Sequence, residues 1–508
     1  MGLFRHLGTR VQARRRSLAG LAAHAAGSTL AMLGAALIPL TAMIGSGVDL
    51  SRTYIAQQRL QQACDAASLA GRRAMENDVF NSTVSTEALK FFNFNFPQGK
   101  YGTTSFTPVV SRPESGVIRV QANTTVPTAV MKIFGFDQLP ISVDCKSSLN
   151  FVNTDIVLVL DTTGSMLCAT TESSCSNSGE KSSSKIKALR AAVLSLYDEL
   201  SSTQTQLAAA GMRLRYGIVP YASTVNVGRL LWDENNAYIR NPANYQKRSC
   251  SGPGYLASCS YAPTSVNHGN GWLTGTSSNS WAGCIEERQT SSAITGSTTT
   301  IPAAAFDLNI DLVPNSTATR WPPYDPQFAS EAGHQVACPT GAVRLQAWTR
   351  SAMDTYLNTL RADGGTYHDI GMIWGARLIS SAGVFADSPD RFNGMPVNKF
   401  IIFMTDGLLD TGPAIYSAYG IEQYDERVTG GSLSTQDERH RQRFNLMCSA
   451  VKNRGVSIWV VAFASSLDAN LTNCATTASQ AATVSNQDAL NAKFVEIGKN
   501  IGSLRLTK

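Results

Sequence analysis

Five oxygen-bearing side chains lie in three loops beside apolar segments of the chain. They belong to Asp161, Thr163, Ser165, Thr366 and Asp406. Carboxylate and hydroxyl oxygens are hard ligands, which suit Mg²⁺, Mn²⁺ or Ca²⁺ better than zinc. The first three residues alternate along one loop, so an extended backbone directs them to the same side. Because hydroxyls are neutral, the bound ion would keep a net positive charge and could accept a carboxylate from another molecule.

The same residue types also favour helix caps and tight turns, which is the alternative interpretation of the three loops. Catalysis would need a nucleophile with a base, or a metal that activates water. The sequence contains no G-x-S-x-G, H-E-x-x-H or G-x-x-x-x-G-K-[ST] pattern. We expect His368, two residues after Thr366, to be an exposed residue at a helix start. We therefore predict that the chain is not an enzyme, with a metal-dependent hydrolase as the less favoured alternative.

Apolar runs that alternate with amphipathic segments must position these loops. Residues 156–160 and 400–404 are continuous apolar runs, as expected for strands buried on both faces of a parallel sheet. Further strands are predicted at 214–219 and 456–463, and helices at 186–200, 437–452 and 490–504. This alternation predicts an α/β fold with a doubly wound, mostly parallel sheet. Asp161 directly follows the first run, and Thr405-Asp406 directly follows the second. Ligands of such sheets collect outside the carboxyl ends of strands.

Residues 232–340 interrupt this pattern within the C-terminal region, 151–508. They are rich in Ser, Thr, Gly, Asn and Pro and contain four tryptophans and four cysteines. A structureless loop of this length is implausible in a compact domain. We predict an inserted, disulfide-containing subdomain whose aromatic side chains form either a binding surface or a small local core.

The N-terminal region has the composition of a membrane anchor. Residues 1–16 contain five arginines and no acidic residue, so the rest of the chain holds only +1 of the net charge of +6 and does not attract nucleic acid. No charged side chain lies in 17–48, and the apolar core at 27–48 predicts one transmembrane helix over 17–49. The arginines predict a cytoplasmic tail at 1–16 and export of the remainder. A cleaved signal peptide is the alternative.

Residues 50–150 predict a helix followed by a small sheet. A stripe on one helix face is formed by Ala56, Leu60, Cys64, Ala67 and Gly71. Its mostly small side chains allow close packing, either against this region's own sheet or against another subunit. Three strands are predicted at 105–110, 116–125 and 141–148, which are rich in Val, Ile and Thr. A continuous helix followed by a small antiparallel sheet is the arrangement of pilin-like subunits.

The cysteines point to an oxidising compartment. The chain has ten, mostly in loop-like sequence. An even number in such positions predicts disulfides, and the absence of any C-x-x-C pair argues against structural zinc. The spacing leaves the pairing open. Export of the bulk of the chain to an oxidising compartment agrees with the arginine-rich N-terminus.

The loop motifs resemble the metal-ion-dependent adhesion site (MIDAS) of von Willebrand factor A (vWA) domains. The motifs are Asp161-x-Thr163-x-Ser165, Gly365-Thr366 and Thr405-Asp406-Gly407. The resemblance implies a Rossmann-like vWA domain over 151–508, interrupted by the insertion, that binds a divalent cation, Mg²⁺ before Mn²⁺ or Ca²⁺. It also implies that the hydroxyls of the first loop contact the ion directly and the two carboxylates partly through water.

A second resemblance, to TadE-like and TadG-like proteins of the tight-adherence (Flp) pilus assembly system, covers both ends of the chain. It is carried by Gly45-Ser46-Gly47-Val48-Asp49, Tyr54, the segment 61–70, Trp374-Gly375, Tyr419-Gly420 and Leu504-Arg505-Leu506. The resemblance implies an inner-membrane protein with a periplasmic C-terminal region that acts in pilus assembly or surface attachment.

Together these features predict a noncatalytic interaction protein. Its ion would bind an acidic side chain of a pilus-assembly or envelope protein, and we expect neither nucleic acid nor a small-molecule substrate as a partner. The alternative is a structural subunit at the pilus base that acts through the helix stripe at 56–71. In that case the vWA domain would be mainly architectural.

Overall fold

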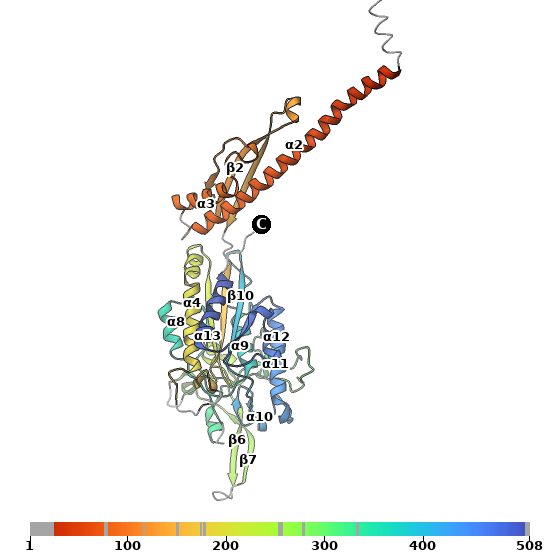
Figure 1. Cartoon of the computed structure of the whole chain (residues 1–508). Helices are drawn as coiled ribbons and strands as arrows, with labels where there is room; N and C mark the ends of the chain where they lie inside the picture. Colours follow the sequence, from red (N-terminus) through yellow and green to blue (C-terminus); the bar gives the residue numbers. More distant parts are fainter. Residues whose placement is uncertain are drawn as a thin grey trace, which may run out of the picture. The chain divides into compact units, whose positions relative to one another are not determined.

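The computed structural model describes residues 25–75, 80–114, 117–148, 152–172, 175, 179–251, 258–276, 280–331 and 335–502 (Figure 1). The chain divides into two compact units, Met1–Asn150 with Leu504–Lys508 (unit 1) and Phe151–Ser503 (unit 2). The predicted tail at 1–16 and the closing Leu504-Arg505-Leu506 motif lie outside the described residues.

Unit 1 is built on one long helix, α2 (Ala25–Ala74). Its part from Met32 to Ala74 contains an apolar window long enough to cross a membrane, and most of this window is not buried by the rest of the chain. A second helix, α3 (Ser82–Asn95), begins where the side chain of Asn81 accepts a hydrogen bond from the Val84 amide. Helix α3 contacts α2, and Val84 joins the shared core.

Three antiparallel strands form the sheet of unit 1 in the order β1-β2-β3: β1 (Val109–Ser111), β2 (Val117–Pro127) and β3 (Gln138–Ser148). Four stripe residues of α2 (Ala56, Leu60, Cys64 and Ala67) are buried against this sheet, and the fifth, Gly71, lies beside Ile118 of β2. A disulfide joins Cys64 to Cys145 of β3. The stripe therefore contacts the unit's own sheet, which is one of the two packing arrangements we considered.

The main sheet of unit 2 has the order β14-β13-β10-β4-β5-β8. Its strands are β4 (Asn153–Asp161), β5 (Leu214–Tyr221), β8 (Val343–Gln346), β10 (Met395–Thr405), β13 (Ser457–Phe463) and β14 (Ala481–Val484). All neighbours are parallel except β8, which is antiparallel to β5; the short β9 (Arg391–Phe392) also pairs with β10 in antiparallel fashion. The predicted mixed α/β architecture with a mostly parallel sheet is confirmed.

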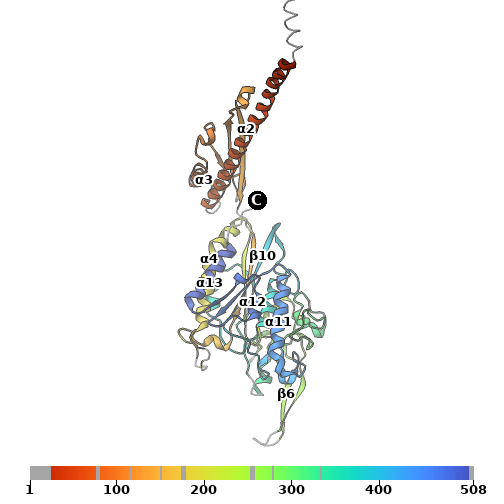
Figure 2. The ribbon, with the colours of Figure 1, turned by 45° about the vertical axis from the view of Figure 1, so that its right-hand side comes forward.

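Helices cover both faces of this sheet (Figure 2). One face packs on α4 (Lys185–Ala209), α8 (Arg350–Leu357) and α13 (Gln487–Gly502), and the other on α9 (His368–Ile379), α11 (Gln436–Lys452) and α12 (Ala469–Cys474). Strand β4 is buried throughout because its side chains alternate between the two cores. Helix α9 comes so close to β4 that a Cβ on Gly375 would lie 2.5 Å from Val159 Cγ2.

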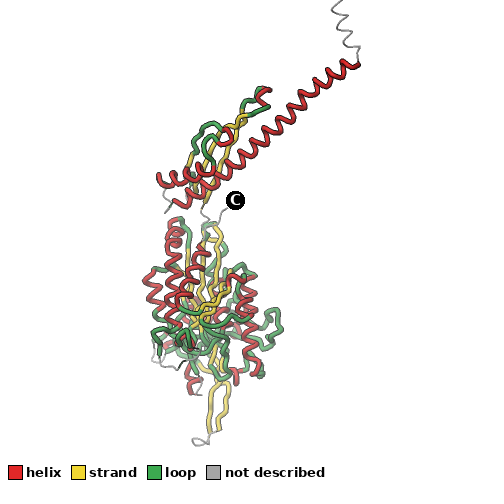
Figure 3. The backbone as a smooth tube through the Cα atoms, viewed as in Figure 1, coloured by secondary structure: helices red, strands yellow, loops and turns green. Residues whose placement is uncertain are grey.

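The segment 232–340 consists mostly of loops, from which one hairpin extends (Figure 3). The hairpin pairs β6 (Ala243–Ser251) with β7 (Ser258–Val266), and the disulfide Cys250–Cys259 links its strands. Trp281 and Trp321 are buried in the same core as α9. We predicted that the aromatic side chains of the insertion form a binding surface or a small local core. For Trp281 and Trp321 both alternatives are wrong, because these side chains belong to the large core of unit 2.

Other short elements are α5 (Gly228–Glu234), α6 (Asn270–Thr274), α7 (Pro326–Glu331), β11 (Tyr416–Ser417), β12 (Gly420–Ile421) and α10 (Glu422–Asp425), besides several single turns of 3-10 helix. All ten cysteines are paired, as Cys64–Cys145, Cys168–Cys175, Cys250–Cys259, Cys284–Cys338 and Cys448–Cys474. The prediction of a disulfide-rich chain is confirmed.

Candidate metal centre

The register of two central strands brings the first and third predicted loops together. Strands β4 and β10 are parallel neighbours, and Met404 pairs with Leu160. Asp161 and Thr405 therefore end adjacent strands at the same edge of the sheet. The chain continues from β4 to its neighbour β5 on one side, and from β10 to its neighbour β13 on the other side. This is a switch point, where ligands of open α/β sheets collect.

A chain of hydrogen bonds links the first loop to Asp406. Ser165 Oγ donates to Asp406 Oδ1 at 2.8 Å, and the hydroxyls of Thr163 and Ser165 are 3.0 Å apart. Because Ser165 has one hydroxyl hydrogen and gives it to the carboxylate, Thr163 is the donor to Ser165. The structure thus places three of the predicted ligand side chains within hydrogen-bonding distance of one another.

Asp161 is fully buried and held from three sides. The backbone amide of Thr163 donates to Oδ1 at 2.9 Å, while the hydroxyls of Thr405 and Tyr221 approach Oδ2 at 2.7 and 3.3 Å. Burial, together with the nearby Asp406 carboxylate, raises the pKa of Asp161 to about 7. Two buried carboxylates that repel each other form an arrangement that a cation would stabilise.

His368 does not lie where we expected. It begins α9, as predicted, but it is buried, and its Nε2 lies 3.0 Å from the Thr405 hydroxyl. Burial lowers the pKa of His368 to about 4, so the ring is neutral. Thr405 gives its hydrogen to Asp161, so Nε2 of His368 is the donor. The prediction of an exposed helix-start residue was wrong because the end of β10 packs against this helix.

Thr366 lies on the second predicted loop, which contacts the first. The carbonyl of Gly364, a residue with φ of +81°, accepts a hydrogen bond from the Gly164 amide at 2.9 Å. The Thr366 backbone pairs with Asp410, and its side chain is buried. Within the described residues, no hydrogen bond joins the Thr366 side chain to the other four predicted ligands, so loop contact alone associates it with them.

Lys185 is a charged residue of the site that no sequence motif indicated. This first residue of α4 is 3% exposed, and its Nζ lies 2.9 Å from Asp406 Oδ2. Asp406 therefore binds a hydroxyl through one oxygen and an ammonium group through the other. A lysine in the first turn of an amphipathic helix normally lies in solvent, so the local pattern carried no signal for this contact.

The donor set fits a hard divalent cation. It offers the carboxylates of Asp161 and Asp406 and the hydroxyls of Thr163 and Ser165, with Thr366 on the adjoining loop. Within the described part of the chain, no group of three or more His, Cys, Asp or Glu side chains could hold an ion. A site at this edge would therefore depend on hydroxyl ligands, and its low ligand charge would leave the ion able to bind a further carboxylate.

Comparison with protein families assigns the N-terminal segment. Residues 27–75 match the Tad family, described as Flp pilus-assembly TadE/G-like. Helix α2 therefore carries a TadE/G-like Flp pilus-assembly domain, and the predicted resemblance is confirmed for this segment. None of the curated proteins compared matches the chain.

Three solved structures of pilus proteins are similar to the chain, each at 12% sequence identity. The pilus adhesin SpaC from Lactobacillus rhamnosus GG has a TM-score of 0.34, over 78% of this chain and 34% of SpaC. The vWF domain of the type V pili tip protein Mfa5 from Porphyromonas gingivalis has a TM-score of 0.31, over 70% and 97%. The PilB minor pilin from Streptococcus sanguinis has a TM-score of 0.32, over 79% of each chain. The chain thus spans about a third of SpaC.

Proposed function

We propose that this chain, whose helix α2 carries a TadE/G-like Flp pilus-assembly domain, is a membrane-anchored pilus-assembly or adhesion protein. In this proposal α2 holds the chain in the bacterial inner membrane, its N-terminus is cytoplasmic, and unit 2 lies in the periplasm. Unit 2 acts as a vWA domain that binds a divalent cation, with Mg²⁺ the first choice, and docks an acidic group of a pilus or envelope protein. It does so without catalysis.

One observation carries the proposal for unit 2: Asp161 and Asp406, buried at the ends of neighbouring strands, are linked through Thr163 and Ser165. Oxygens from two loops converge there without a cluster of neutralising side chains, except for Lys185 on one carboxylate oxygen. When bound, a cation would supply a positive charge that attracts a partner's carboxylate. The protein residues would orient the ion and exclude water from its inner side.

The alternative of a pilus-base subunit that acts through the helix stripe lacks a free surface. The residues of that stripe are buried against the sheet of unit 1 or lie beside it. A partner could contact them only if the sheet moved away. For this reason we propose the ion-dependent docking function.

Thermal unfolding of the full-length chain in detergent tests the metal site. All seven tryptophans lie in unit 2, so their fluorescence reports its unfolding alone. Mg²⁺ at a hundredfold excess over its dissociation constant should stabilise unit 2 by about 2.7 kcal/mol relative to EDTA. The variant Asp161→Ala should lose this response. Asp198→Ala, which removes an exposed carboxylate on α4, should keep it.

Two further outcomes decide the proposal. If Mg²⁺, Mn²⁺ and Ca²⁺ all leave the unfolding temperature of the wild type unchanged, the cation-binding function is wrong. If the ion binds but cells with Asp161→Ala attach to surfaces and assemble pili as well as cells with Asp198→Ala do, the docking function is wrong.

A further inference from the structure

The turn between β2 and β3 is hydrogen-bonded to helix α2 through the carboxylate of Asp49. Asp49 is buried, and its two oxygens accept hydrogen bonds from the backbone amides of Ala129, Val130 and Met131, each at 2.8 Å. Ala129 and Val130 precede the short helical turn Met131–Phe134, which lies within the longer β2–β3 turn. Three charge-assisted hydrogen bonds hold this turn at one level of α2.

That level lies at the end of the apolar segment of α2. Val130 packs directly on Gly45, since a Cβ on Gly45 would lie 2.1 Å from Val130 Cγ1. Gly45 precedes Asp49 by one turn, which is about 6 Å along the helix axis. The turn Met131–Phe134 is therefore beside the last turn of the uncharged run of α2, which ends at Val48.

Large apolar side chains of the turn face solvent. Ile133 is 79% exposed, Phe136 57% and Phe134 44%. On α2, Ile44 and Val48 at the same level are also exposed. Such a group of apolar side chains on one surface marks a contact with another apolar phase.

Most backbone amides of the β2–β3 turn have hydrogen-bond partners within the protein and do not need water as an acceptor. Besides the three amides bound by Asp49, the amides of Ile133, Gly135 and Phe136 donate to carbonyls within the turn. Paired backbone groups can approach a bilayer without the penalty of an unsatisfied hydrogen bond. The turn is therefore suited to the boundary between headgroups and acyl chains.

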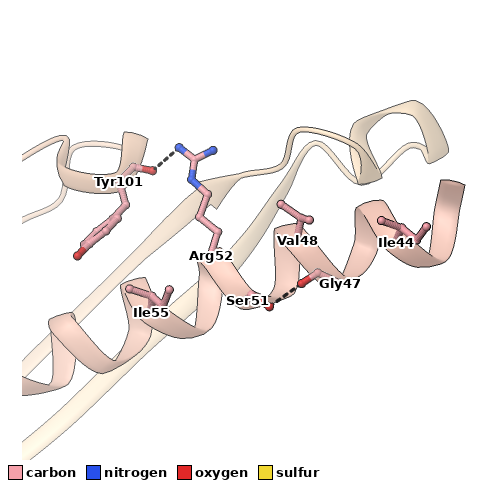
Figure 4. A pocket seen from close by; sticks show the side chains of 7 residues that line it. All are labelled: Ile44, Gly47, Val48, Ser51, Arg52, Ile55 and Tyr101. Atoms are coloured by element: carbon pink, nitrogen blue, oxygen red, sulfur yellow. Dashed lines mark hydrogen bonds between the residues drawn. The ribbon is translucent and has the colours of Figure 1, made fainter.

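A groove continues this surface along the same face of α2 (Figure 4). It has a volume of about 530 Å³, with Ile44 and Val48 at one end and Arg52 and Tyr101 at the other. The Arg52 guanidinium donates to the Tyr101 carbonyl at 3.2 Å and stays exposed. The groove thus pairs apolar walls with a cationic group, which matches a phospholipid whose acyl chain lies beside Ile44 and Val48.

We propose that the β2–β3 turn of unit 1 inserts Ile133, Phe134 and Phe136 into the membrane surface beside the transmembrane helix. The occupant of this apolar surface is the lipid bilayer, because the surface is continuous with the exposed apolar side chains of α2. The turn acts as a second membrane contact that fixes how unit 1 is oriented. The inference rests on the proposed anchoring of α2, and it is independent of the metal site.

A fluorescent label in the full-length chain tests the insertion. All native cysteines are paired, so Ile133→Cys supplies a single free thiol for an environment-sensitive dye. Val109→Cys is the matched control, because Val109 is also exposed and apolar and pairs with Gln121 of β2. Gln121 precedes the end of β2 by about 20 Å. Both labelled proteins are reconstituted into phosphatidylcholine–phosphatidylglycerol vesicles, with or without nitroxide groups on the acyl chains.

We expect acyl-chain nitroxides to quench the label at residue 133 and not the label at residue 109. Iodide in the buffer should quench the label at residue 109 and not the label at residue 133. A label at 133 that iodide quenches as strongly as the label at 109, in vesicles that float with the protein, would overturn the insertion and leave the anchor intact. Protein that fails to float with the vesicles would overturn the anchor and the insertion together. Shielding of residue 133 that disappears when lipid dilutes the protein would assign the surface to a second copy and overturn the proposal.

Discussion

Lys185 provides the sharpest test of the electrostatics at the end of β4 and β10. Its ammonium group is the cation in contact with Asp406, and both side chains are buried. The substitution Lys185→Met keeps much of the side-chain volume and removes the charge. Two carboxylates, Asp161 and Asp406, then remain buried without the ammonium group. We expect the variant to be less stable than the wild type in EDTA.

The size of the effect follows from burial of the pair. Removal of one partner of a buried ion pair costs about 3–5 kcal/mol. Unit 2 has roughly 350 residues, so its unfolding entropy of about 0.7 kcal/mol per degree converts this cost into a decrease of about 4–7 °C in Tm. Tryptophan fluorescence during heating measures the change. A divalent cation should raise the Tm of Lys185→Met more than that of the wild type, because no ammonium group opposes it.

Lys187→Met is the control, since Lys187 lies on the same helix and its side chain is 44% exposed. Its Tm should stay close to that of the wild type, because exposed substitutions change stability by about 0.5 kcal/mol or less. If Lys185→Met unfolds at the wild-type temperature in EDTA, the ion pair with Asp406 does not hold the site together. If Mg²⁺ stabilises the variant and the wild type equally, Lys185 does not oppose the ion.

Three further predictions concern other parts of the chain. Burial outweighs the effect of the neighbouring Arg427 and raises the pKa of Glu286 to about 7, so between pH 4.5 and 7 the folded state holds a proton that the unfolded state releases. The free energy of unfolding should therefore fall by up to about 3 kcal/mol as pH rises through this window. Denaturant unfolding of Glu286→Gln should show no such fall. Replacement of Cys64 and Cys145 by alanine should destabilise unit 1 by about 2–5 kcal/mol, seen as faster hydrogen exchange in β3, with no change in the tryptophan-monitored unfolding of unit 2. Asp49→Ala should accelerate hydrogen exchange of the amides at 129–131, while those of β1 stay protected; equal protection in variant and wild type would refute the role of this carboxylate.

The sequence predicted the elements that local patterns encode. The apolar runs at 156–160 and 400–404 became β4 and β10, because a strand buried on both faces must be apolar throughout. The periodic segment from Ile186 became α4 for a similar reason. Asp161 and Asp406 could be placed together before the structure was known, since the carboxyl ends of adjacent parallel strands meet at one edge.

Contacts between distant segments could not be read from these patterns. Lys185 lies in a polar stretch and resembles any solvated helix residue; its partner, Asp406, is 221 residues away. The burial of His368 depends on the end of β10, which no periodicity near residue 368 reveals. Likewise, Trp321 lies in polar sequence, yet it packs against Trp374 of α9. Each of these side chains is positioned by tertiary packing that outweighs its local propensity.

The position of β4 has a mechanical consequence. The chain leaves the sheet of unit 1 at Ser148 and enters unit 2 through β4, whose nine residues end at Asp161. When α2 is held and a partner pulls on the Asp161 loop, tension runs along the whole length of this strand. Its hydrogen bonds to β5 and β10 lie across the direction of pull, so both ladders bear the load at once and none is peeled open first. The Asp161 loop is thus connected to unit 1 through a strand with parallel partners on both sides, an arrangement that resists extension.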